Sequence, residues 1–600
     1  MKKIGTLVCI LLSVCFTAFS QISTRQIKGR VVGEDNEPLA GASVVIAGSK
    51  KGVQTDNNGN FTLSVLNDGD KNSLLISYVG YATKTVDVHA AGNISVHLTR
   101  TNDAGNEVVV IGYQTVKRKD LLASVSSVGA KDLKDIPINS AAEALAGRLA
   151  GVQITSSEGS PDANITIRVR GGGSITQDNS PLYIVDGVQI ENALASLAPQ
   201  DIQSIDVLKD AAATAIYGAR GANGVVIITT KGGRQGKLRM SYNGFIGLEK
   251  LAKELPVMSP WEFIRWNYER SRSNSTDSAT FAKTYGTTWD TLSVYKSIAP
   301  VDWQKLVLGR NGMMQSNNVS VNGGNSKTTF NLSYTNNTDK TVVLNSNYYR
   351  NLINLRVDQR IGKKIRMSAT FRYLNQNVYG AGTSSPNGST YNRLRNTVKY
   401  RPFLSPNITT PDVIDPSLVD NSTGNGLFLV NPIALSNAEY RKKSTDGLNI
   451  SGYVSYQITK NLTFRSTFGY DYNHYINRQY SDSISPVSII QGGAKPVVEL
   501  DTSNRTSINN SNVFTYSLKN LGGKHDIDVL LGQETYQVRT ESTYDLFKNI
   551  PTFTPIDKAF NDLSLGTSFT GYPKQIITKY TSLSFFERIN YVYEQKYTIE

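Results

Sequence analysis

Cysteine is almost absent from this chain, whose 600 residues contain only Cys9 and Cys15. Both lie within residues 1–20, a segment with the features of a cleaved leader. After its removal, the mature chain would have neither a disulfide nor a thiol for catalysis or metal binding.

Histidine is also scarce. The chain has four, His89, His97, His474 and His525, which are scattered, and no spacing of His, Cys, Asp or Glu resembles a metal site. A G-x-S-x-G nucleophile motif is missing as well. We therefore predict that the chain is not an enzyme and needs no cofactor or metal. A secreted β-rich adhesin or hydrolase is the alternative from another functional class.

Long apolar and basic runs are missing too. No stretch after residue 20 approaches eighteen apolar residues, so any part that crosses a membrane must be a β-barrel. The net charge is +14, yet no Lys/Arg run exceeds three residues. Diffuse positive charge is typical of a solvated surface or a channel wall, and we predict no nucleic-acid partner.

The leader is a predicted secretory signal peptide, residues 1–20. Two lysines form its charged start, an apolar stretch follows, and the small residues Ala18 and Ser20 stand at −3 and −1 of the expected cleavage site. A lipoprotein anchor on Cys15 is the alternative, but the three residues before it form a poor lipobox. We favour export and cleavage after Ser20.

The composition predicts a mainly β protein. Tyrosine (31) outnumbers phenylalanine (19), glycine reaches 49, and polar positions are rich in Asn, Ser and Thr. Residues 27–98 contain six short alternating runs separated by turn residues, which indicates a small β-sandwich. Its oxygen-rich segment 56–60 could be a calcium loop, but no Glu closes it, so we expect a hairpin turn.

A polar linker, 99–106, leads to the β-branched run at 107–113. Such a run alone most simply predicts a buried strand. Here it stands between a linker and the basic residues 117–119, without an evident hairpin partner. We therefore expect an exposed strand that a second protein can extend by β-augmentation.

Residues 120–233 form a predicted α+β segment. Its glycine clusters match neither a P-loop nor the G-x-G-x-x-G pattern, so a nucleotide site is not predicted. The expected elements are helices at 141–149 and near 199–201, and strands at 152–155, 165–170, 182–185, 205–208 and 225–230.

From residue 237 onward, eleven strands with alternating faces are predicted. The predicted strands span 237–249, 314–322, 325–336, 348–360, 364–377, 446–459, 461–475, 502–518, 524–540, 581–594 and a last one that begins at 596. In 364–373, for example, Met367, Ala369 and Phe371 share one face, while Ser368 and Arg372 share the other.

Tight turns and long loops alternate between these strands, which is typical of outer-membrane barrels. Tyrosines near strand ends fit interfacial girdles, namely Tyr334, Tyr348, Tyr349, Tyr373, Tyr472 and Tyr475. A plugged transporter barrel has ~22 strands, so we expect 237–600 to be about half of one and the chain to be an N-terminal part.

Specific motifs identify a family. The runs E-A-L-A-G-R-L-A-G-V-Q-I (143–154), I-R-V-R-G-G-G-S (167–174) and P-L-Y-I-V-D-G-V (181–188) resemble the plug domain of TonB-dependent receptors, and D-I-Q-S-I-D-V-L-K-D-A-A-A-T-A-I-Y-G-A-R-G-A-N-G-V-V-I-I-T-T-K-G-G (201–233) resembles the SusC/RagA branch. Residues 27–98 are similar to a carboxypeptidase-regulatory-like domain. The resemblance implies that the segment 107–113 is the TonB box, with TonB contacts from Glu107, Val108, Val109, Val110, Ile111, Gly112 and Tyr113.

The plug motif also has a direct physical interpretation. Its glycines provide tight turns and close backbone approach, and its charges need partners if a wall encloses them. Either these residues form a plug–wall ion network or they only fold the plug, and the sequence leaves both open. They are Arg168, Arg170, Gly171, Asp186, Gly187, Lys209, Asp210, Tyr217, Gly218, Arg220, Gly221 and Gly224.

The resemblance implies TonB-driven import of an oligosaccharide or peptide across the outer membrane of a Gram-negative bacterium. The implied partners are TonB, a SusD-like surface lipoprotein that caps the channel, the substrate and the surrounding lipid. The N-terminal domains would be periplasmic. A siderophore or cobalamin receptor of the same architecture is the nearest alternative.

Overall fold

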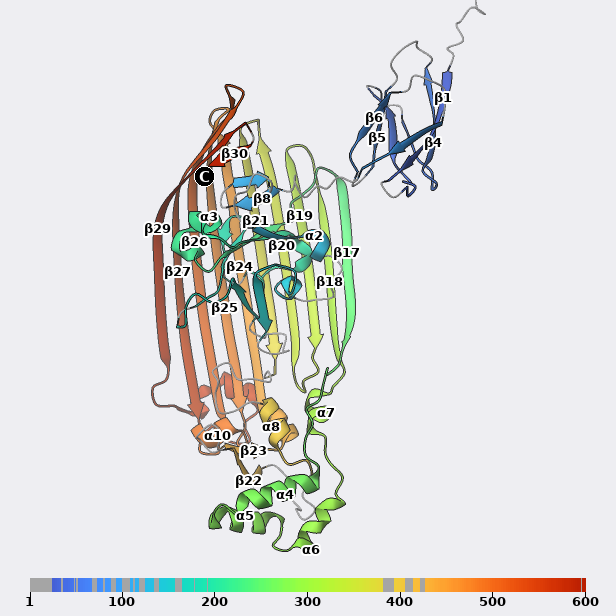
Figure 1. The fold of residues 1–600 in the computed structure, drawn as a ribbon. Coiled ribbons are helices and arrows are strands. Elements are labelled where there is room, and N and C mark those ends of the chain that lie inside the picture. The colour runs from blue at the N-terminus through green and yellow to red at the C-terminus, as the bar shows by residue number, and fades with distance from the viewer. Residues whose placement is uncertain are drawn as a thin grey trace, which may run out of the picture. The chain divides into compact units, whose positions relative to one another are not determined.

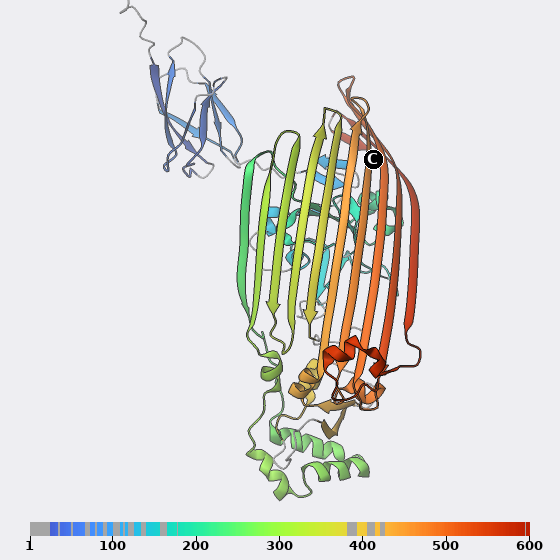
Figure 2. The same cartoon turned by 180° about the vertical axis from the view of Figure 1, so that it is seen from behind.

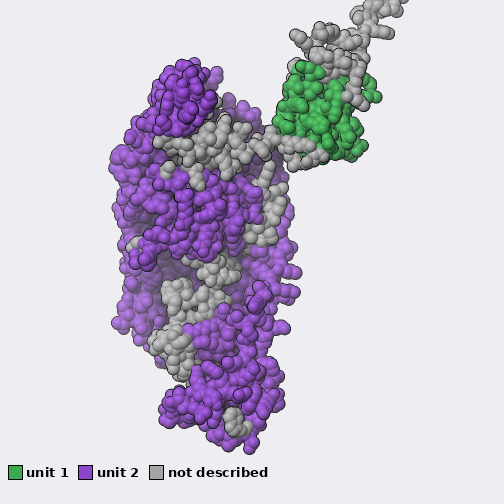
Figure 3. All heavy atoms as spheres, viewed as in Figure 1, with its two compact units in different colours: residues 1–108, 117–119 green, residues 109–116, 120–600 purple. Residues whose placement is uncertain are grey.

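The computed structural model describes residues 24–599 apart from 34–35, 48, 50–51, 67–72, 79–80, 88–92, 100–107, 112–113, 118–124, 134–139, 157–164, 177, 192, 381–392, 405–413, 421–426 and 595. The chain divides into two compact units, one formed by residues 1–108 and 117–119 and the other by 109–116 and 120–600 (Figure 3). The predicted signal peptide lies outside the described residues.

The smaller unit is a sandwich of two sheets. One sheet has the order β4 (Asn60–Leu66), β1 (Thr24–Val32), β7 (Asn93–His97), and the other has the order β3 (Gly52–Gln54), β2 (Ser43–Ile46), β5 (Ser73–Ser77), β6 (Lys84–Asp87). Buried residues of both sheets, including Val31, Val44 and Ile76, form one core. The six predicted strands are confirmed, and β3 is a seventh whose three residues are too short to show alternation.

The segment 56–60 is a tight turn. The Asp56 carboxylate accepts hydrogen bonds from the backbone N–H groups of Asn58 at 2.9 Å and Asn60 at 2.8 Å. Because β3 and β4 belong to different sheets, the turn passes between the two layers and is not the hairpin that we expected.

The expectation that residues 107–113 have no hairpin partner is wrong. β8 (Val108–Ile111) pairs with β9 (Gln114–Lys117) in a two-stranded sheet. Only two residues separate the strands, so they form a hairpin. Glu107, Gly112 and Tyr113 lie outside the described residues. The sequence does not indicate β9 as a strand, because Gln-Thr-Val-Lys is mostly polar and lacks the apolar run that marks β8.

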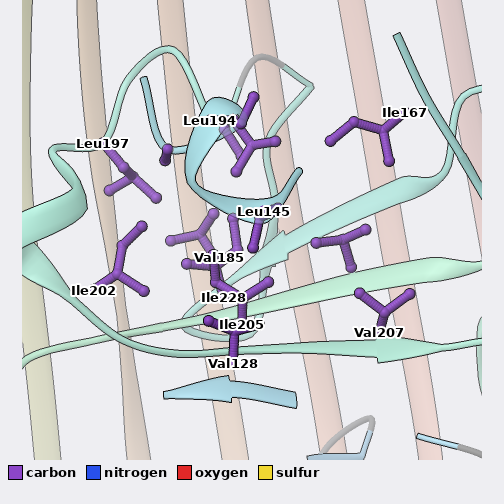
Figure 4. Close-up of a cluster of buried hydrophobic side chains, with 14 of the residues drawn as sticks. Val128, Leu145, Ile167, Val185, Leu194, Leu197, Ile202, Ile205, Val207 and Ile228 are labelled. Atoms are coloured by element: carbon purple, nitrogen blue, oxygen red, sulfur yellow. The ribbon is translucent and has the colours of Figure 1, made fainter. Parts of the chain in front are cut away.

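The plug is built on a five-stranded sheet with the order β10 (Val125–Gly129), β15 (Ile202–Leu208), β16 (Val225–Thr230), β13 (Leu182–Val185), β14 (Val188–Gln189), next to the pair β11 (Val152–Ser156) and β12 (Ile165–Val169). Buried aliphatic side chains from several of these elements, such as Val185, Ile205 and Ile228, converge in its core (Figure 4). The five strands predicted in this segment are confirmed.

The predicted helix at 141–149 is wrong. Within it only η3 (Glu143–Leu145) is helical, as a single 3-10 turn. Gly147 has φ +72, which a right-handed helix cannot accommodate, so the backbone turns there instead. The second predicted helix is the 3-10 turn η4 (Pro199–Asp201).

A single large antiparallel sheet contains all eleven strands predicted after residue 237, and the short β28 makes it 12-stranded. Figures 1 and 2 show the plug on one face of this sheet. The strands are β17 (Gly236–Glu249), β18 (Gly312–Gly324), β19 (Thr328–Lys340), β20 (Asn347–Ile361), β21 (Ile365–Tyr379), β24 (Glu439–Gln457), β25 (Leu462–Ser481), β26 (Val497–Leu521), β27 (His525–Lys548), β28 (Thr567–Ser568), β29 (Lys574–Tyr593) and β30 (Tyr597–Ile599).

The two faces of the sheet differ as the alternation predicts. On β21, Ser368 and Arg372 are 7% and 3% exposed, whereas Met367 and Phe371 are 38% and 40% exposed. Along the neighbouring strands, every second residue faces inward, and many of these inward-facing residues are buried and polar. The outer face carries the large exposed apolar side chains, as a lipid-facing surface requires.

The predicted tyrosine girdle needs correction. Tyr334, Tyr349 and Tyr373 are exposed on the outer face, but Tyr348 is 4% exposed and lies on the inner face. Tyr475 shares the inner face with Asp471, four residues away on the same strand. Adjacent residues of one strand point to opposite sides, so Tyr348 and Tyr349 cannot both meet lipid.

Several strands are longer than predicted. β26 contains 25 residues and β27 contains 24, and β24 begins at Glu439 instead of 446. The added ends of β24 and β27 are rich in charged and hydroxyl residues and carry no apolar alternation, and the added start of β26 begins with two adjacent buried valines, Val497 and Val498, which do not alternate either. For the same reason, the connection between β19 and β20 shortens to 341–346.

The long connections contain their own secondary structure. The β17–β18 loop holds α4 (Pro260–Ser271), α5 (Ser275–Tyr285), α6 (Trp289–Leu292), η6 (Ser293–Lys296) and α7 (Trp303–Leu308), and the β21–β24 loop holds α8 (Arg393–Lys399), β22 (Ile414–Asp420), β23 (Leu427–Val430) and α9 (Pro432–Ala438). α10 (Pro486–Gln491) follows β25, and α11 (Ile556–Asn561) with η8 (Leu563–Leu565) follows β27. Of the helices in the described residues, none has the length and apolar character needed to cross a membrane.

Candidate functional site

Asp186 occupies the tight turn between β13 and β14. Its backbone has φ +51, and Gly187 after it has φ +91, so both residues adopt the left-handed conformation of a tight turn. Within the plug, Asp186 accepts hydrogen bonds from the Thr230 backbone N–H at 2.9 Å and from the Thr230 hydroxyl at 2.7 Å. The turn is therefore fixed to the end of β16.

Two arginines of the wall meet the same carboxylate. The Arg372 guanidinium on β21 donates to Asp186 Oδ2, and Arg356 Nη1 on β20 lies 3.2 Å from Asp186 Oδ1. Arg356 also pairs with Asp358 at 3.2 Å. The side chain of Arg372 is 4% exposed and that of Asp186 is 11% exposed. One plug carboxylate thus connects two neighbouring wall strands in a water-poor setting.

The electrostatics of this cluster favour the ionised pair. Burial alone would raise the pKa of the Asp186 carboxyl, but the guanidinium groups of Arg372 and Arg356 and the hydrogen bonds from Thr230 hold it below its usual value. Removing one member would leave a buried charge without compensation, which is costly.

Arg220 forms a second connection between plug and wall. It lies in η5 (Ala215–Gly221), and its Nη2 is 2.6 Å from Glu534 Oε1 on β27. Its guanidinium also donates to the Gln189 side chain and lies 5.1 Å from the ring centre of Tyr536. A charged hydrogen bond and a cation–π contact therefore anchor the same side chain.

Two further contacts extend the interface along the wall. Arg505 on β26 pairs with the plug residue Glu191 and lies 3.8 Å from Asp471. Arg350 Nη1 on β20 donates to the Ala195 carbonyl at 3.2 Å. Ion pairs and a hydrogen bond thus connect the plug with strands on both sides of β21.

Other predicted site residues stay within the plug. Lys209 Nζ donates to Ser126 Oγ at 2.5 Å and to the Ala150 carbonyl at 2.6 Å. Burial and the nearby Arg170 lower the pKa of Lys209. Asp210 caps α3 (Ala211–Thr214) by accepting from the Ala213 N–H at 2.8 Å. Lys209 and Asp210 therefore support the interpretation that some of the motif only folds the plug.

Arg168 and Arg170 show no ion pair with the wall in the part of the chain that the structure describes. Arg168 lies on β12, and its guanidinium lies close to the backbone of Gly172: a Cβ added to Gly172 would be 2.9 Å from Arg168 Nη1. Arg170 is exposed with φ +56 and begins the turn that Gly171 continues with φ +92.

The remaining motif residues shape the plug backbone. Gly218 has φ +59 and interrupts η5, and Gly224 has φ +88 with its would-be Cβ 2.9 Å from Val169. A Cβ on Gly221 would lie 3.0 Å from the Thr214 carbonyl oxygen. Tyr217 packs against the cluster that contains Leu208 and Ile227. An added Cβ would therefore crowd its neighbours at Gly221 and Gly224, whereas at Gly218 the space is open and the positive φ is what favours glycine.

Sequence reasoning did not single out most of the wall partners. Arg372 was expected on the inner face, but Arg356, Arg505 and Glu534 carry no motif. Their signal is a charged residue on the inner face of a predicted barrel strand, because such a residue needs a partner inside the wall. In the part of the chain that the structure describes, no cluster of His, Cys, Asp and Glu is suited to hold a metal ion.

Family models match two parts of the chain. Residues 117–225 match the TonB-dependent receptor plug domain, and residues 27–110 match the CarboxypepD_reg-like domain. The first match contains Asp186 and Arg220 and ends at the start of β16.

Curated relatives match most of the chain. TonB-dependent receptor P3 of Formosa agariphila is 30% identical over 588 residues, which are 97% of this chain and 54% of the relative. TonB-dependent receptor P26 of the same organism is 32% identical over 97% of this chain and 56% of its own length. TonB-dependent receptor SusC of Bacteroides thetaiotaomicron is 36% identical over 342 residues, 56% of this chain and 32% of SusC. The chain spans about half the length of P3 and P26.

Solved structures share the fold. The RagAB peptide importer in its open-open state aligns with a TM-score of 0.63 at 23% identity, over 82% of this chain and 55% of the other. At that identity the match shows the fold alone. Together with the relatives and the two domain matches, it establishes that this chain belongs to the SusC/RagA family of TonB-dependent receptors, which are β-barrel proteins of the outer membrane.

Proposed function

We propose that the protein imports a nutrient, an oligosaccharide or a peptide, across the outer membrane in a TonB-dependent manner. The observation that carries this proposal is the Asp186 cluster, in which one buried plug carboxylate is ion-paired to two strands of the wall. A plug held by a few directional contacts can keep a channel closed and still be displaced by a mechanical pull. This transport needs no covalent chemistry.

The proposed handle for that pull is the segment 107–113. Its described part, β8, is already extended and uses one edge to pair with β9. A strand has two edges, so the other edge of β8 is the proposed pairing site for TonB. Backbone hydrogen bonds would transmit the force, which makes the backbone donors of β8 more important than its side chains.

A SusD-like surface lipoprotein is the proposed lid, and the family relationship to SusC and RagA supports it. The same relationship favours an oligosaccharide or peptide over a siderophore. The helical loops that connect the strands at the end opposite the tight turns would face the lid outside the cell.

The experiment is a Val109→Pro substitution in the full-length protein. Proline removes a backbone donor and fixes φ, so it blocks strand pairing. We expect loss of binding to the periplasmic domain of TonB and loss of uptake of fluorescent peptide and oligosaccharide pools, with surface binding of the pools retained. Wild-type uptake in this variant would refute the proposal.

A further inference from the structure

Carboxyl groups from three elements gather where β17 leads into the loop that contains α4 and α7 (Figure 1). Glu249 is the last residue of β17, Asp339 lies one residue before the end of β19, and Glu143 belongs to η3 of the plug. Gly247, Met314 and Asp339 lie in one row across β17, β18 and β19. Glu249 is two residues beyond Gly247, so its side chain points to the same inner face as Asp339.

Glu249 and Asp339 share a hydrogen bond between their side chains. Two carboxyl groups can form such a bond only when one of them carries a proton, because an ionised carboxylate accepts but does not donate. Glu143 lies close enough for its charge to act on both groups. The three carboxylates therefore repel one another unless a proton or another positive charge lies among them.

Asp339 has an acceptor without a donor. The residue is 6% exposed, and its Oδ1 accepts no hydrogen bond from any residue that the structure describes. A buried oxygen in that state costs free energy. The carboxylate pair Glu499 and Asp501 on β26 differs in this respect, because Asp501 Oδ2 accepts from Asn477 at 3.0 Å. The Asp339 oxygen is thus available to a donor from outside the chain.

The arginines near these carboxylates are held by other acceptors. Arg310 donates to two backbone carbonyls of the β19–β20 connection, at 2.9 and 2.8 Å. Arg350 donates to a side-chain amide of β19 and to a backbone carbonyl of the plug, both at 3.2 Å. Among the described residues, no ion pair includes Glu249, Asp339 or Glu143. The two arginines reduce the negative charge of the cluster from a distance but do not pair with it.

An ammonium group fits this arrangement better than a metal ion. In the described part of the chain, no group of three or more His, Cys, Asp or Glu side chains is placed to hold a metal, so the three carboxylates do not converge on one point. An ammonium group is a compact positive charge with three donors. Two donors suit the carboxylates of Asp339 and Glu249, and the positive charge replaces that of the shared proton. A neutral sugar ring brings hydroxyl donors but no charge.

We propose that Glu249 and Asp339 bind an ammonium group of the transported nutrient, with Glu143 of the plug adding to the attraction. The ammonium takes the place of the shared proton, which is released to water. Glu249 is half-buried and Glu143 is exposed, so the ammonium reaches Asp339 past these two residues. This inference rests on the proposed import and narrows its substrate to a nutrient with a free amine, such as a lysine-containing peptide or a glucosamine oligosaccharide.

Acetylation of the ligand tests for the ammonium group. The probes are the peptide Gly-Gly-Lys-Gly-Gly with both ends capped, the same peptide with acetyl-lysine, a trisaccharide of glucosamine, and its N-acetylated counterpart. Isothermal titration of the full-length protein in detergent should show roughly tenfold tighter binding of the free amine than of its acetylated form, because a hydrogen bond to a charged group is lost. Discrimination in the peptide pair identifies a peptide as the source of the amine, and discrimination in the sugar pair identifies an amino sugar. Equal affinities within both pairs would overturn the proposal.

Charge-removing variants test the site itself. Asp339→Asn keeps the size of the side chain but removes the negative charge, so most of the preference for the free amine should disappear. Glu249→Gln should have the same effect and provides the answer if Asp339→Asn does not fold. Asp501→Asn is the matched control, because it makes the same change of charge elsewhere on the inner face and should keep the preference. An equal loss in Asp501→Asn would show that diffuse negative charge attracts the amine, and would overturn the site. Binding is measured without TonB, so a negative result here leaves the outcome of Val109→Pro unchanged.

Discussion

Among single residues, Asp186 makes the ionic contacts that connect the plug with two strands of the wall. It receives two guanidinium groups from the wall and two hydrogen bonds from Thr230. Its φ of +51 is tolerated because aspartate is among the residues that adopt this conformation most readily. A residue held in that way determines where the plug turn meets the wall.

Asp186→Asn should destabilise the seated plug by about 3–5 kcal/mol, because it leaves Arg372 buried without a carboxylate, whereas Arg356 keeps Asp358. Asp178→Asn is the control. Asp178 is an exposed aspartate of the plug, and its carboxylate accepts hydrogen bonds from the backbone N–H and the hydroxyl of Ser180, two residues further along the chain. Calorimetry of the full-length protein in detergent should show a lower plug transition for Asp186→Asn and a change within ~0.5 kcal/mol for Asp178→Asn. Similar small effects for both would mean that the cluster does not hold the plug.

The pKa of Asp201 is shifted in the opposite direction to the pKa of Asp186. Asp201 is 4% exposed, and burial raises its pKa to about 6 despite the lowering effect of Lys231 and Arg372. A raised pKa means that the folded plug binds the proton more tightly than the unfolded chain. The folded state therefore loses stability as pH rises from ~4 to about 6, and the loss is complete above that range.

Asp201→Asn should remove this pH dependence. A shift of about two pKa units corresponds to roughly 3 kcal/mol, so the variant should be more stable than the wild type at pH 7 by on the order of 1–3 kcal/mol and equal to it at pH 4. Plug melting at pH 4, 5, 6 and 7 measures the difference. A gap between variant and wild type that does not change with pH would show that Asp201 does not titrate in this window.

At the scale of elements, the β8–β9 hairpin changes the view of the proposed TonB segment. One edge of β8 is already occupied, and TonB can use only the other edge unless β9 leaves. The sequence shows the apolar run but not its partner, because a short polar strand has no distinctive pattern.

Thr115→Pro tests the hairpin from its other strand. It disrupts β9 and leaves 107–113 intact, so TonB binding should be as strong as in the wild type or stronger, whereas Val109→Pro should abolish binding. Isothermal titration with the periplasmic domain of TonB compares the two. Equal loss in both variants would place residues 114–117 within the binding segment.

The strands of the large sheet were the most predictable elements. Their period of two follows from geometry, and the apolar outer face of β21 is visible in Met367, Ala369 and Phe371. A lipid-phase thiol probe should label Ala369→Cys and spare Ser368→Cys, since position 368 is 7% exposed and faces inward. Preferential labelling of 368 would reverse the assignment of the faces.

The sequence did not predict features that depend on an unusual backbone conformation or on a partner far away in the chain. Gly147 ends the expected helix at 141–149 through its positive φ, which local propensity does not reveal. Arg356 and Glu534 find their plug partners across 170 and 314 residues of sequence. No local pattern encodes such a pairing, although the inner-face position of each residue is readable once the strand is known.

At the scale of the whole molecule, the plug and the wall meet in a set of specific contacts within one compact unit. The regulatory-like sandwich, in contrast, has a separate core of its own. The buried core of the sandwich therefore contains no residue of the plug or of the wall.

The proposed import requires the plug to leave its place on the wall. Val188 and Gly469 provide the test, because the Val188 Cβ lies 3.2 Å from the position of a Cβ on Gly469. That separation is close to the one a disulfide spans. Val188→Cys with Gly469→Cys should therefore fasten β14 to β25 under oxidising conditions, and Val188→Cys alone is the control.

The measurement is uptake of the labelled pools by cells that carry the double variant, before and after a reductant. Uptake should be lost in the oxidised double variant, return on reduction and be unaffected by either treatment in the single variant. Undiminished uptake with the disulfide demonstrably formed would contradict the proposal.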